Sequence, residues 1–110
     1  MVDVGTDLRV IFNERRNGPE RLVCEAELAF QTGILAGLKL HGFTLWRSAE
    51  GDIYPTVPSR TIGGGVDRRY FDLIRSQDGA GQVKRLKAWI LSEYQRWVDA
   101  GKPAEIDRIT

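Results

Sequence analysis

The stretch Ile53–Arg75 reads IYPTVPSRTIGGGVDRRYFDLIR and decides how the chain folds. Proline cannot donate a hydrogen bond to a β ladder, so Pro55 and Pro58 mark an edge strand or its frayed end. Three consecutive glycines at 63–65 then separate this strand from an arginine-rich run at 66–75. An edge strand beside a basic loop can accept a partner, which is either another subunit or a phosphate backbone.

Alternating apolar and polar side chains predict five strands. They cover residues 7–14, 22–30, 34–47, 53–57 and 66–75, with turns at 17–20, 31–33 and 48–52. In the third strand the apolar positions change parity, because Leu40 and Phe43 are three positions apart, whereas side chains on one strand face lie an even number of positions apart. A β-bulge at His41-Gly42, with Gly42 as the permissive residue, explains this change most simply.

The periodicity becomes helical after residue 80. Apolar residues recur at spacings of three and four, at Val83, Leu86, Ile90, Tyr94 and Trp97. A helix is therefore predicted from about residue 80 to residue 100, with Asp78 as its N-cap, Gly101 as its C-cap and Pro103 as its stop.

The helix is also apolar outside this stripe, at Trp89, Leu91 and Val98. A helix that is apolar over so much of its circumference usually buries a second surface. In a chain this small, a homodimer contact is the expected use of that surface.

Together these elements predict an α+β fold, in which an antiparallel five-stranded meander-type sheet precedes one long C-terminal helix. The 110 residues are expected to form a single domain. Its ordered core is expected at about residues 7–100, and residues 102–110 are expected to form a loose tail.

The formal net charge of +1 hides an uneven distribution. Residues 39–87 carry nine Lys or Arg against five acids, which gives +4, whereas residues 1–38 give −2 and residues 88–110 give −1. Arginine outnumbers lysine twelve to four, and guanidinium groups bind phosphates through paired hydrogen bonds. The positive centre favours DNA or RNA as a partner, although a solvated arginine-rich surface would have the same composition.

Several other classes are disfavoured. No apolar run approaches the roughly 18–20 residues needed to span a bilayer, and the first residues do not resemble a signal peptide, so no membrane partner and a cytoplasmic location are expected. One cysteine, Cys24, and one histidine, His41, provide neither a disulfide nor a zinc site, and no cofactor or metal is expected. No nucleophile with a partner base is visible, so no catalytic residue is assigned and no enzyme is expected.

The candidate nucleic-acid-binding residues are seven basic side chains: Arg60, Arg68, Arg69, Arg75, Lys84, Arg85 and Lys87. Cations that cluster on one surface bind phosphates without reading the base sequence. The alternative is a solvated face on which Arg69 pairs with Asp67 or Asp72.

The aromatic residues and the histidine each have two interpretations. Trp46, Tyr54 and Tyr70 could stack on bases, but core packing or a dimer contact is favoured. His41 beside a bulge is interpreted as structural, and Cys24 as a small buried hydrophobe.

Two further motifs are also interpreted as structural. The glycines at 63–65 lack the Gly-Lys-Ser/Thr ending of a phosphate-binding P-loop, so they are expected to form a flexible hairpin connection. Glu25 and Glu27 share one strand face without a metal-ligand context, and are expected to be solvated.

Five segments of the chain occur in the order and spacing of a known family. They are residues 26–30, 40–47, 53–60, 71–73 and 90–94, and Pro58-Ser59-Arg60 is the sharpest of the matching pieces. Over roughly residues 8–97, the chain resembles the SpoVG (stage V sporulation protein G) family.

This resemblance implies a small dimeric fold with an antiparallel sheet and a C-terminal helix. It also implies binding of DNA, and of RNA in some members, to regulate transcripts. The implicated basic residues follow the Pro-Ser pair and lie near the helix start, which here are Arg60, Lys84, Arg85 and Lys87. The chain departs from the family pattern at Thr61, where a second basic residue is common, and at Arg75-Ser76, which replace a His-Pro pair.

Two functions from different classes are thus expected. The first is a homodimeric nucleic-acid-binding regulator of the SpoVG type. The alternative is a protein–protein interaction module that binds its partner through the edge strand and the helix. A continuous basic groove would favour the first function, and a flat apolar patch would favour the second.

Overall fold

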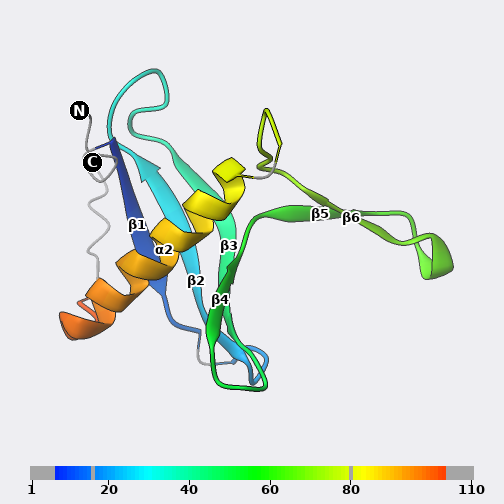
Figure 1. Ribbon diagram of the computed structural model, residues 1–110, viewed down its shortest axis with the longest axis horizontal. Coiled ribbons are helices and arrows are strands. Elements are labelled where there is room, and N and C mark those ends of the chain that lie inside the picture. Colours follow the sequence, from blue (N-terminus) through cyan, green and yellow to red (C-terminus); the bar gives the residue numbers. More distant parts are fainter. Residues whose placement is uncertain (1–6, 16, 80, 104–110) are drawn as a thin grey trace.

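The computed structural model describes residues 7–15, 17–79 and 81–103, and within these ranges six strands precede one long helix (Figure 1). The strands are β1 (Leu8–Asn13), β2 (Leu22–Phe30), β3 (Lys39–Arg47), β4 (Ile53–Thr56), β5 (Ser59–Ile62) and β6 (Arg69–Asp72). A short 3-10 helix, η1 (Gly65–Asp67), lies between β5 and β6, and the long helix is α2 (Gly81–Asp99). The expected α+β class is confirmed.

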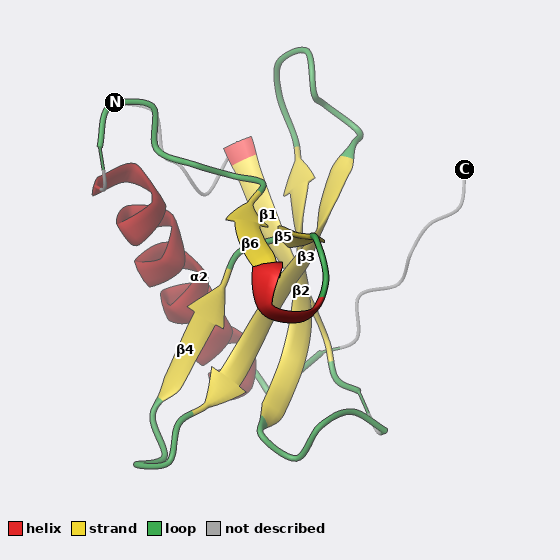
Figure 2. Ribbon diagram, turned by 90° about the vertical axis from the view of Figure 1, so that its right-hand side faces the viewer, coloured by secondary structure: helices red, strands yellow, loops and turns green. Residues whose placement is uncertain are grey.

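The first four strands form one antiparallel sheet in the order β1-β2-β3-β4. Helix α2 crosses one face of this sheet, as the two perpendicular views in Figures 1 and 2 show. The strand marked by Pro55 is an edge strand, as expected, because β4 has β3 as its only neighbour within the described sheet.

The fifth predicted strand does not join this sheet, so the expectation of a single five-stranded sheet is wrong. Strand β6 instead pairs with β5, which the sequence pattern did not reveal, and the two form a separate two-stranded ribbon. We call residues 59–72 the arm. It projects away from the sheet and the helix (Figure 1). The predicted strand at 66–75 is also shortened to Arg69–Asp72, because residues 65–67 form the 3-10 turn after the glycines.

Strand β3 begins at Lys39 and not at Ile34 as predicted. The preceding residues form consecutive turns, in which the Ala36 N–H donates to the Gly33 carbonyl and the Leu38 N–H to the Leu35 carbonyl. Gly33 and Gly37 both have positive φ, so apolar residues between them lie in a loop despite their strand-like composition.

The bulge predicted at His41-Gly42 is confirmed. Ala26 pairs with Phe43 and Leu28 pairs with Leu40, so β3 has one residue more than β2 between these pairs. Gly42 has φ +107°, a conformation that favours glycine. The extra residue turns both Leu40 and Phe43 toward the core side of the sheet.

The core lies between α2 and the sheet. Its fully buried side chains are Phe43, Leu45, Ile90 and Cys24. Beside them Phe12 packs edge-on against Tyr94, with ring centroids 5.6 Å apart. The predicted helical stripe therefore faces the core.

The expected second apolar surface of α2 is smaller than predicted. Trp89 and Val98 are partly buried and pack against the core, and Leu91 is half-buried. Residues beside the main stripe of α2 thus also find apolar neighbours in the core cluster. The helix alone is thus a weaker basis for a homodimer than the sequence indicated.

Both ends of α2 are fixed by hydrogen bonds. At the start, the Val83 N–H donates to Ser76 Oγ at 3.0 Å, so Ser76 supplies a cap that was expected from Asp78. At the end, the Lys102 N–H donates to the Trp97 carbonyl and the Gly101 N–H to the Val98 carbonyl, which confirms Gly101 as the C-terminal cap. Of the predicted tail, residues 104–110 lie outside the described residues.

Gly42 is expected to tolerate no side chain. A Cβ at this position would lie 2.9 Å from Pro58 Cβ, in addition to the strain of the positive φ. Gly42→Ala should therefore lower the free energy of unfolding by about 1–3 kcal/mol for the backbone strain and by a further 1–3 kcal/mol or so for the overpacking. Urea unfolding would measure both terms together.

Gly51→Ala is the matched control, because Gly51 has φ +92° but a Cβ added there would meet no atom within 4 Å. It should show the strain without the overpacking. Equal losses of stability in the two variants would contradict the proposed contact with Pro58.

Candidate nucleic-acid interface

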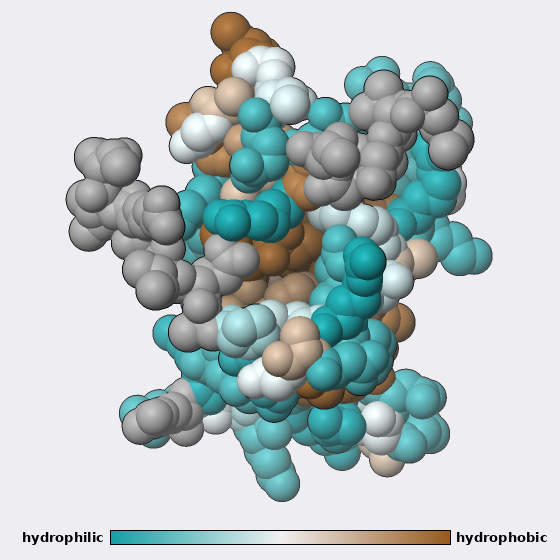
Figure 3. Space-filling view, turned by 90° about the vertical axis from the view of Figure 1, so that its left-hand side faces the viewer, coloured by the Kyte–Doolittle hydropathy of each residue, from teal (hydrophilic) through white to brown (hydrophobic). Residues whose placement is uncertain are grey.

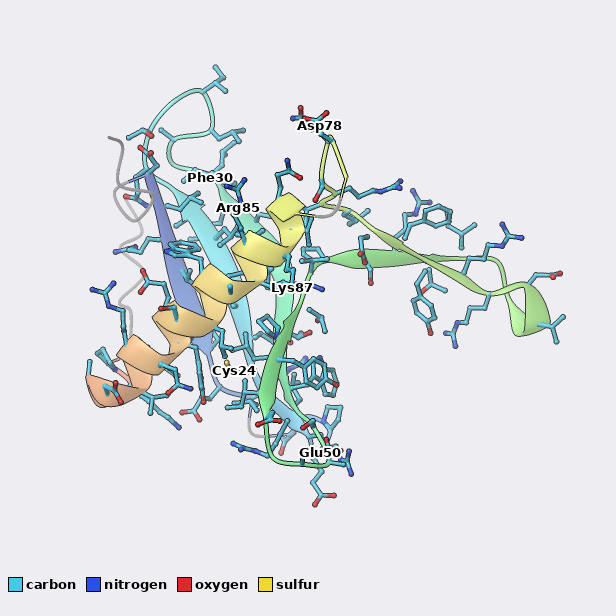
Figure 4. The ribbon with its side chains drawn as sticks, viewed as in Figure 1. Cys24, Phe30, Glu50, Asp78, Arg85 and Lys87 are labelled. Atoms are coloured by element: carbon cyan, nitrogen blue, oxygen red, sulfur yellow. The ribbon has the colours of Figure 1, made fainter. Side chains whose placement is uncertain are left out.

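The first two turns of α2 carry three of the seven candidate cations. Lys84 and Lys87 are three residues apart and therefore share one side of the helix. Arg85 lies on another side: Figure 4 shows Arg85 and Lys87 on opposite sides of α2. The helix start therefore divides the predicted cluster.

Lys84 and Lys87 face a groove between the helix start and the segment that leaves β6. The groove has a volume of about 360 Å³ and is lined by Asp72, Ile74, Arg75, Ser76, Gly79, Val83, Lys84 and Lys87. We call it the basic groove. Three of its lining side chains are cationic and one is anionic, so its net charge is about +2 by this count.

The walls of the basic groove are held by the core and by backbone hydrogen bonds. Ile74 and Val83 are partly buried and pack against the core cluster. The Ser76 hydroxyl is bound to the helix start through Val83. At the other end of the wall, the Leu73 N–H donates to the Pro58 carbonyl at 2.7 Å. The cations of the groove are thus carried on fixed backbone while their ends reach solvent.

The electrostatics of the basic groove favour an anion. The start of a helix carries a partial positive charge of about half an elementary charge, which arises from its aligned peptide dipoles. Arg75, Lys84 and Lys87 add full charges beside it, and Arg75 and Lys84 are exposed. Asp72 opposes this field but provides only one charge. A phosphate group is the anion that arginine and lysine together bind well.

The remaining three candidates, Arg60, Arg68 and Arg69, lie on the arm and are exposed. The Arg68 guanidinium lies over the ring of Tyr70, 5.8 Å from its centroid. The structure thus brings Arg75, Lys84 and Lys87 together in the basic groove and separates the arm arginines from them.

The internal pairs considered for Arg69 do not form. Among the described residues, no ion pair joins Arg69 to Asp67 or to Asp72. The register explains why for Asp72, because Arg69 and Asp72 point to opposite faces of the ribbon. The positive charge of this side chain is therefore available to a partner.

Ser76 is the residue of this region that sequence reasoning missed. Serine is a favoured helix cap, and its position before the helix was a usable signal. Asp78, nearer to the first helical residue, was preferred, but it is Ser76 that lies within hydrogen-bond distance of the third helical residue, Val83.

Glu27 is not solvated as expected. Its side chain is only 16% exposed, with Lys39 Nζ 3.7 Å from Glu27 Oε2 and His41 Nδ1 3.2 Å from Glu27 Oε1. Glu25 pairs with Arg15 at 3.1 Å. Both carboxylates line a hollow of about 250 Å³ beside the bulge, together with His41, on the sheet face away from α2. We call this face the open sheet face.

The three aromatic residues do not all pack in the core. Trp46 is half-buried, and its Nε1 donates to Thr44 Oγ1 at 2.8 Å. Tyr54, its cross-strand neighbour, is exposed. Tyr70 is 67% exposed on the arm, so core packing is wrong for this residue.

A further hollow of about 290 Å³ lies where β1 meets the C-terminal half of α2. Its apolar lining includes Val10, Phe12 and Trp97. Figure 3, which views this side of the molecule, shows apolar side chains within a hollow and hydrophilic side chains around it. Trp97 Nε1 donates to the Pro103 carbonyl at 3.0 Å, so one of the lining side chains is held by the segment that follows α2.

The single cysteine cannot act as a nucleophile at neutral pH. Cys24 is fully buried, and burial, with the nearby Glu14 carboxylate, raises the pKa of its thiol to about 12. In the part of the chain that the structure describes, no three His, Cys, Asp or Glu side chains are grouped to hold a metal ion. No described helix is both long and apolar enough to cross a membrane.

Neither a comparison with protein-family models nor searches of curated proteins and of solved structures found a match.

Cys24 generates a prediction about alkaline pH. The unfolded thiol ionises near 9.0 and the folded thiol near 12, so the stability present below pH 9 is lost as the pH rises between these values. The expected loss is about 1.4 kcal/mol per pH unit, measured by urea unfolding at several pH values.

Cys24→Ala should reduce this dependence but not abolish it, because burial also raises the pKa of Tyr94. Rapid labelling of Cys24 by a thiol reagent in the folded protein at neutral pH would contradict the burial.

Proposed function

We propose that this chain is a homodimeric nucleic-acid-binding regulator of the SpoVG type. The observation that carries the proposal is the convergence of Arg75, Lys84 and Lys87 on one groove at the start of a helix. The resemblance around Pro58-Ser59-Arg60 and at the helix start supports the same function. DNA and RNA share the phosphate chemistry to which the groove is suited.

In this proposal the basic groove binds backbone phosphates. Phosphate contacts supply affinity and orientation but carry no direct sequence information. Each neutralised phosphate releases condensed counterions, so the binding should weaken steeply with salt. The arm, which leaves the body beside Asp72 and Ile74 at the groove, carries three further arginines toward the same ligand.

The test is fluorescence anisotropy with labelled single- and double-stranded DNA and RNA at about 50 and 200 mM salt, concentrations between which phosphate-driven affinity falls steeply. Lys84→Gln with Lys87→Gln should weaken binding to all sequences alike and reduce the salt slope by about one unit per lost contact. Arg96→Gln is the matched control, because Arg96 is exposed at the far end of the same helix, where it pairs with Glu93.

Two outcomes would count against the proposal. One is the absence of binding to any of the four ligands at the lower salt while the protein is folded. The other is an equal effect of the helix-start variant and of Arg96→Gln, since the groove would then have no special part in binding.

The homodimer is expected to use the β4 edge. This strand is unpaired on one side within the described sheet, and Tyr54 exposes a large aromatic side chain there. Sedimentation at micromolar concentration should give twice the 12.4 kDa mass of the chain, and Tyr54→Lys should shift the equilibrium toward the monomer. Leu35→Lys, which changes an exposed apolar side chain in the 31–38 loop, should leave the dimer intact.

A single 12.4 kDa species of the wild-type chain would refute the dimer. Equal dissociation by Tyr54→Lys and Leu35→Lys would show that the contact is not specific to the β4 edge.

The alternative function is a protein–protein interaction module. The observation that favours it is the exposure of large apolar side chains on and beside the arm, at Ile62, Val66, Tyr70, Phe71 and Leu73. Exposed apolar groups that cluster in this way often mark a protein contact. Loss of nucleic-acid binding in the assay above, with the protein folded, would favour this alternative.

A further inference from the structure

The arm has the dimensions of a groove-binding ribbon. Strands β5 and β6 have four residues each, and all eight are exposed. Two paired strands lie about 4.8 Å apart, and four residues extend about 13 Å. The major groove of B-DNA is about 12 Å wide and admits a two-stranded β-ribbon.

The register of the arm separates its two faces chemically. Arg60 pairs with Phe71 and Ile62 pairs with Arg69, so these four side chains share one face. The other face carries Ser59, Thr61, Tyr70 and Asp72. The first face therefore holds two arginines and no acid, and the carboxylate of Asp72 points away from it.

The spacing of the two arginines fits stacked bases. Arg60 and Arg69 are diagonal neighbours on adjacent strands, and such positions lie about 7–8 Å apart. Base pairs two steps apart are separated by about 6.8 Å along the duplex. Arginine binds O6 and N7 of guanine bidentately in the major groove, and apolar groups such as Phe71 contact the methyl group of thymine.

The base of the arm is anchored so that the ribbon is presented in one direction. Pro58 is buried against Gly42, and its carbonyl accepts the Leu73 N–H. On the opposite face, Arg68 lies over Tyr70. Arg60 and Arg69 are exposed on the first face. Within the described part of the arm, their guanidinium groups have no ion-pair partner.

We propose that the arm enters the major groove of duplex DNA with the face of Arg60, Ile62, Arg69 and Phe71, and that the two arginines read guanines two base pairs apart. The inference rests on the proposed function, because the basic groove holds the flanking phosphates. It selects DNA over RNA as the duplex, since the major groove of A-form RNA is too deep and narrow for side chains to read.

The experiment begins with the folded wild-type chain and a pool of randomised DNA duplexes, from which binding sequences are enriched. The affinity for an enriched duplex is then compared with that for a shuffled duplex of the same composition. Arg60→Gln and Arg69→Gln should each reduce this preference on the order of tenfold to a hundredfold, because each removes one bidentate contact. Arg68→Gln removes the same charge from the other face, so it should weaken binding to the enriched and the shuffled duplex alike and leave the ratio of the two affinities unchanged.

A second measurement tests the groove itself. Replacing guanine by 7-deazaguanine in the enriched duplex removes the N7 acceptor without changing the phosphates. The wild-type chain should lose affinity for this duplex, whereas the double variant Arg60→Gln, Arg69→Gln should not distinguish it from the unmodified one. Duplex RNA of the enriched sequence should bind without preference.

The outcomes separate this inference from the proposed function. No binding to any nucleic acid overturns both. Binding with a normal salt slope, but with no sequence preference or with a preference that Arg60→Gln and Arg69→Gln leave intact, overturns the arm inference alone. Dissociation of the dimer by these variants, with the preference unchanged, identifies the arm as a subunit contact and also overturns it.

Discussion

The contact between Gly42 and Pro58 is the constraint on which the rest of the structure depends. A bulge at Gly42 is needed so that both halves of β3 direct apolar side chains to the core, and its positive φ requires glycine. The same missing side chain makes room for Pro58, which could not otherwise lie against the strand. One glycine therefore sets which side chains of β3 face the core and the point where the arm leaves the sheet.

The position of the basic groove follows from this point. Pro58 cannot donate a hydrogen bond, so the ladder with β3 ends before it and the chain turns away into β5. The Pro58 carbonyl binds the Leu73 N–H, which returns the chain to the body just before Ile74 and Arg75. The wall of the groove is thus fixed at one end by the bulge and at the other by the Ser76 cap on α2.

Much of the main body could be predicted from the sequence, because its strands and helix each bury one face and therefore show a clear period. The parity change at Leu40 and Phe43 even located the bulge. The arm was predicted less well, since a ribbon exposed on both faces leaves no alternation that would mark β5. The seven cations could be listed from the sequence, but their separation into a groove group, an arm group and Arg85 could not. This separation depends on the side of α2 that carries Arg85 and on where the arm leaves the sheet.

In the proposed binding of a nucleic acid, the charge of the open sheet face favours the arm and the basic groove over this face. Trp46 and Tyr54 lie on an antiparallel sheet, an arrangement that could offer a stacking surface for bases. Glu25 and Glu27 stand on the adjoining strand of that face, and one carboxylate oxygen of Glu27 is buried without a hydrogen bond. Phosphates approaching there would meet two carboxylates whose neighbouring cations, Arg15 and Lys39, are already engaged with them. Among the residues that the structure describes, Asp72 is the one acid that lines the basic groove. The basic groove and the open sheet face therefore differ less in their number of basic residues than in how many of those residues are already paired with a carboxylate.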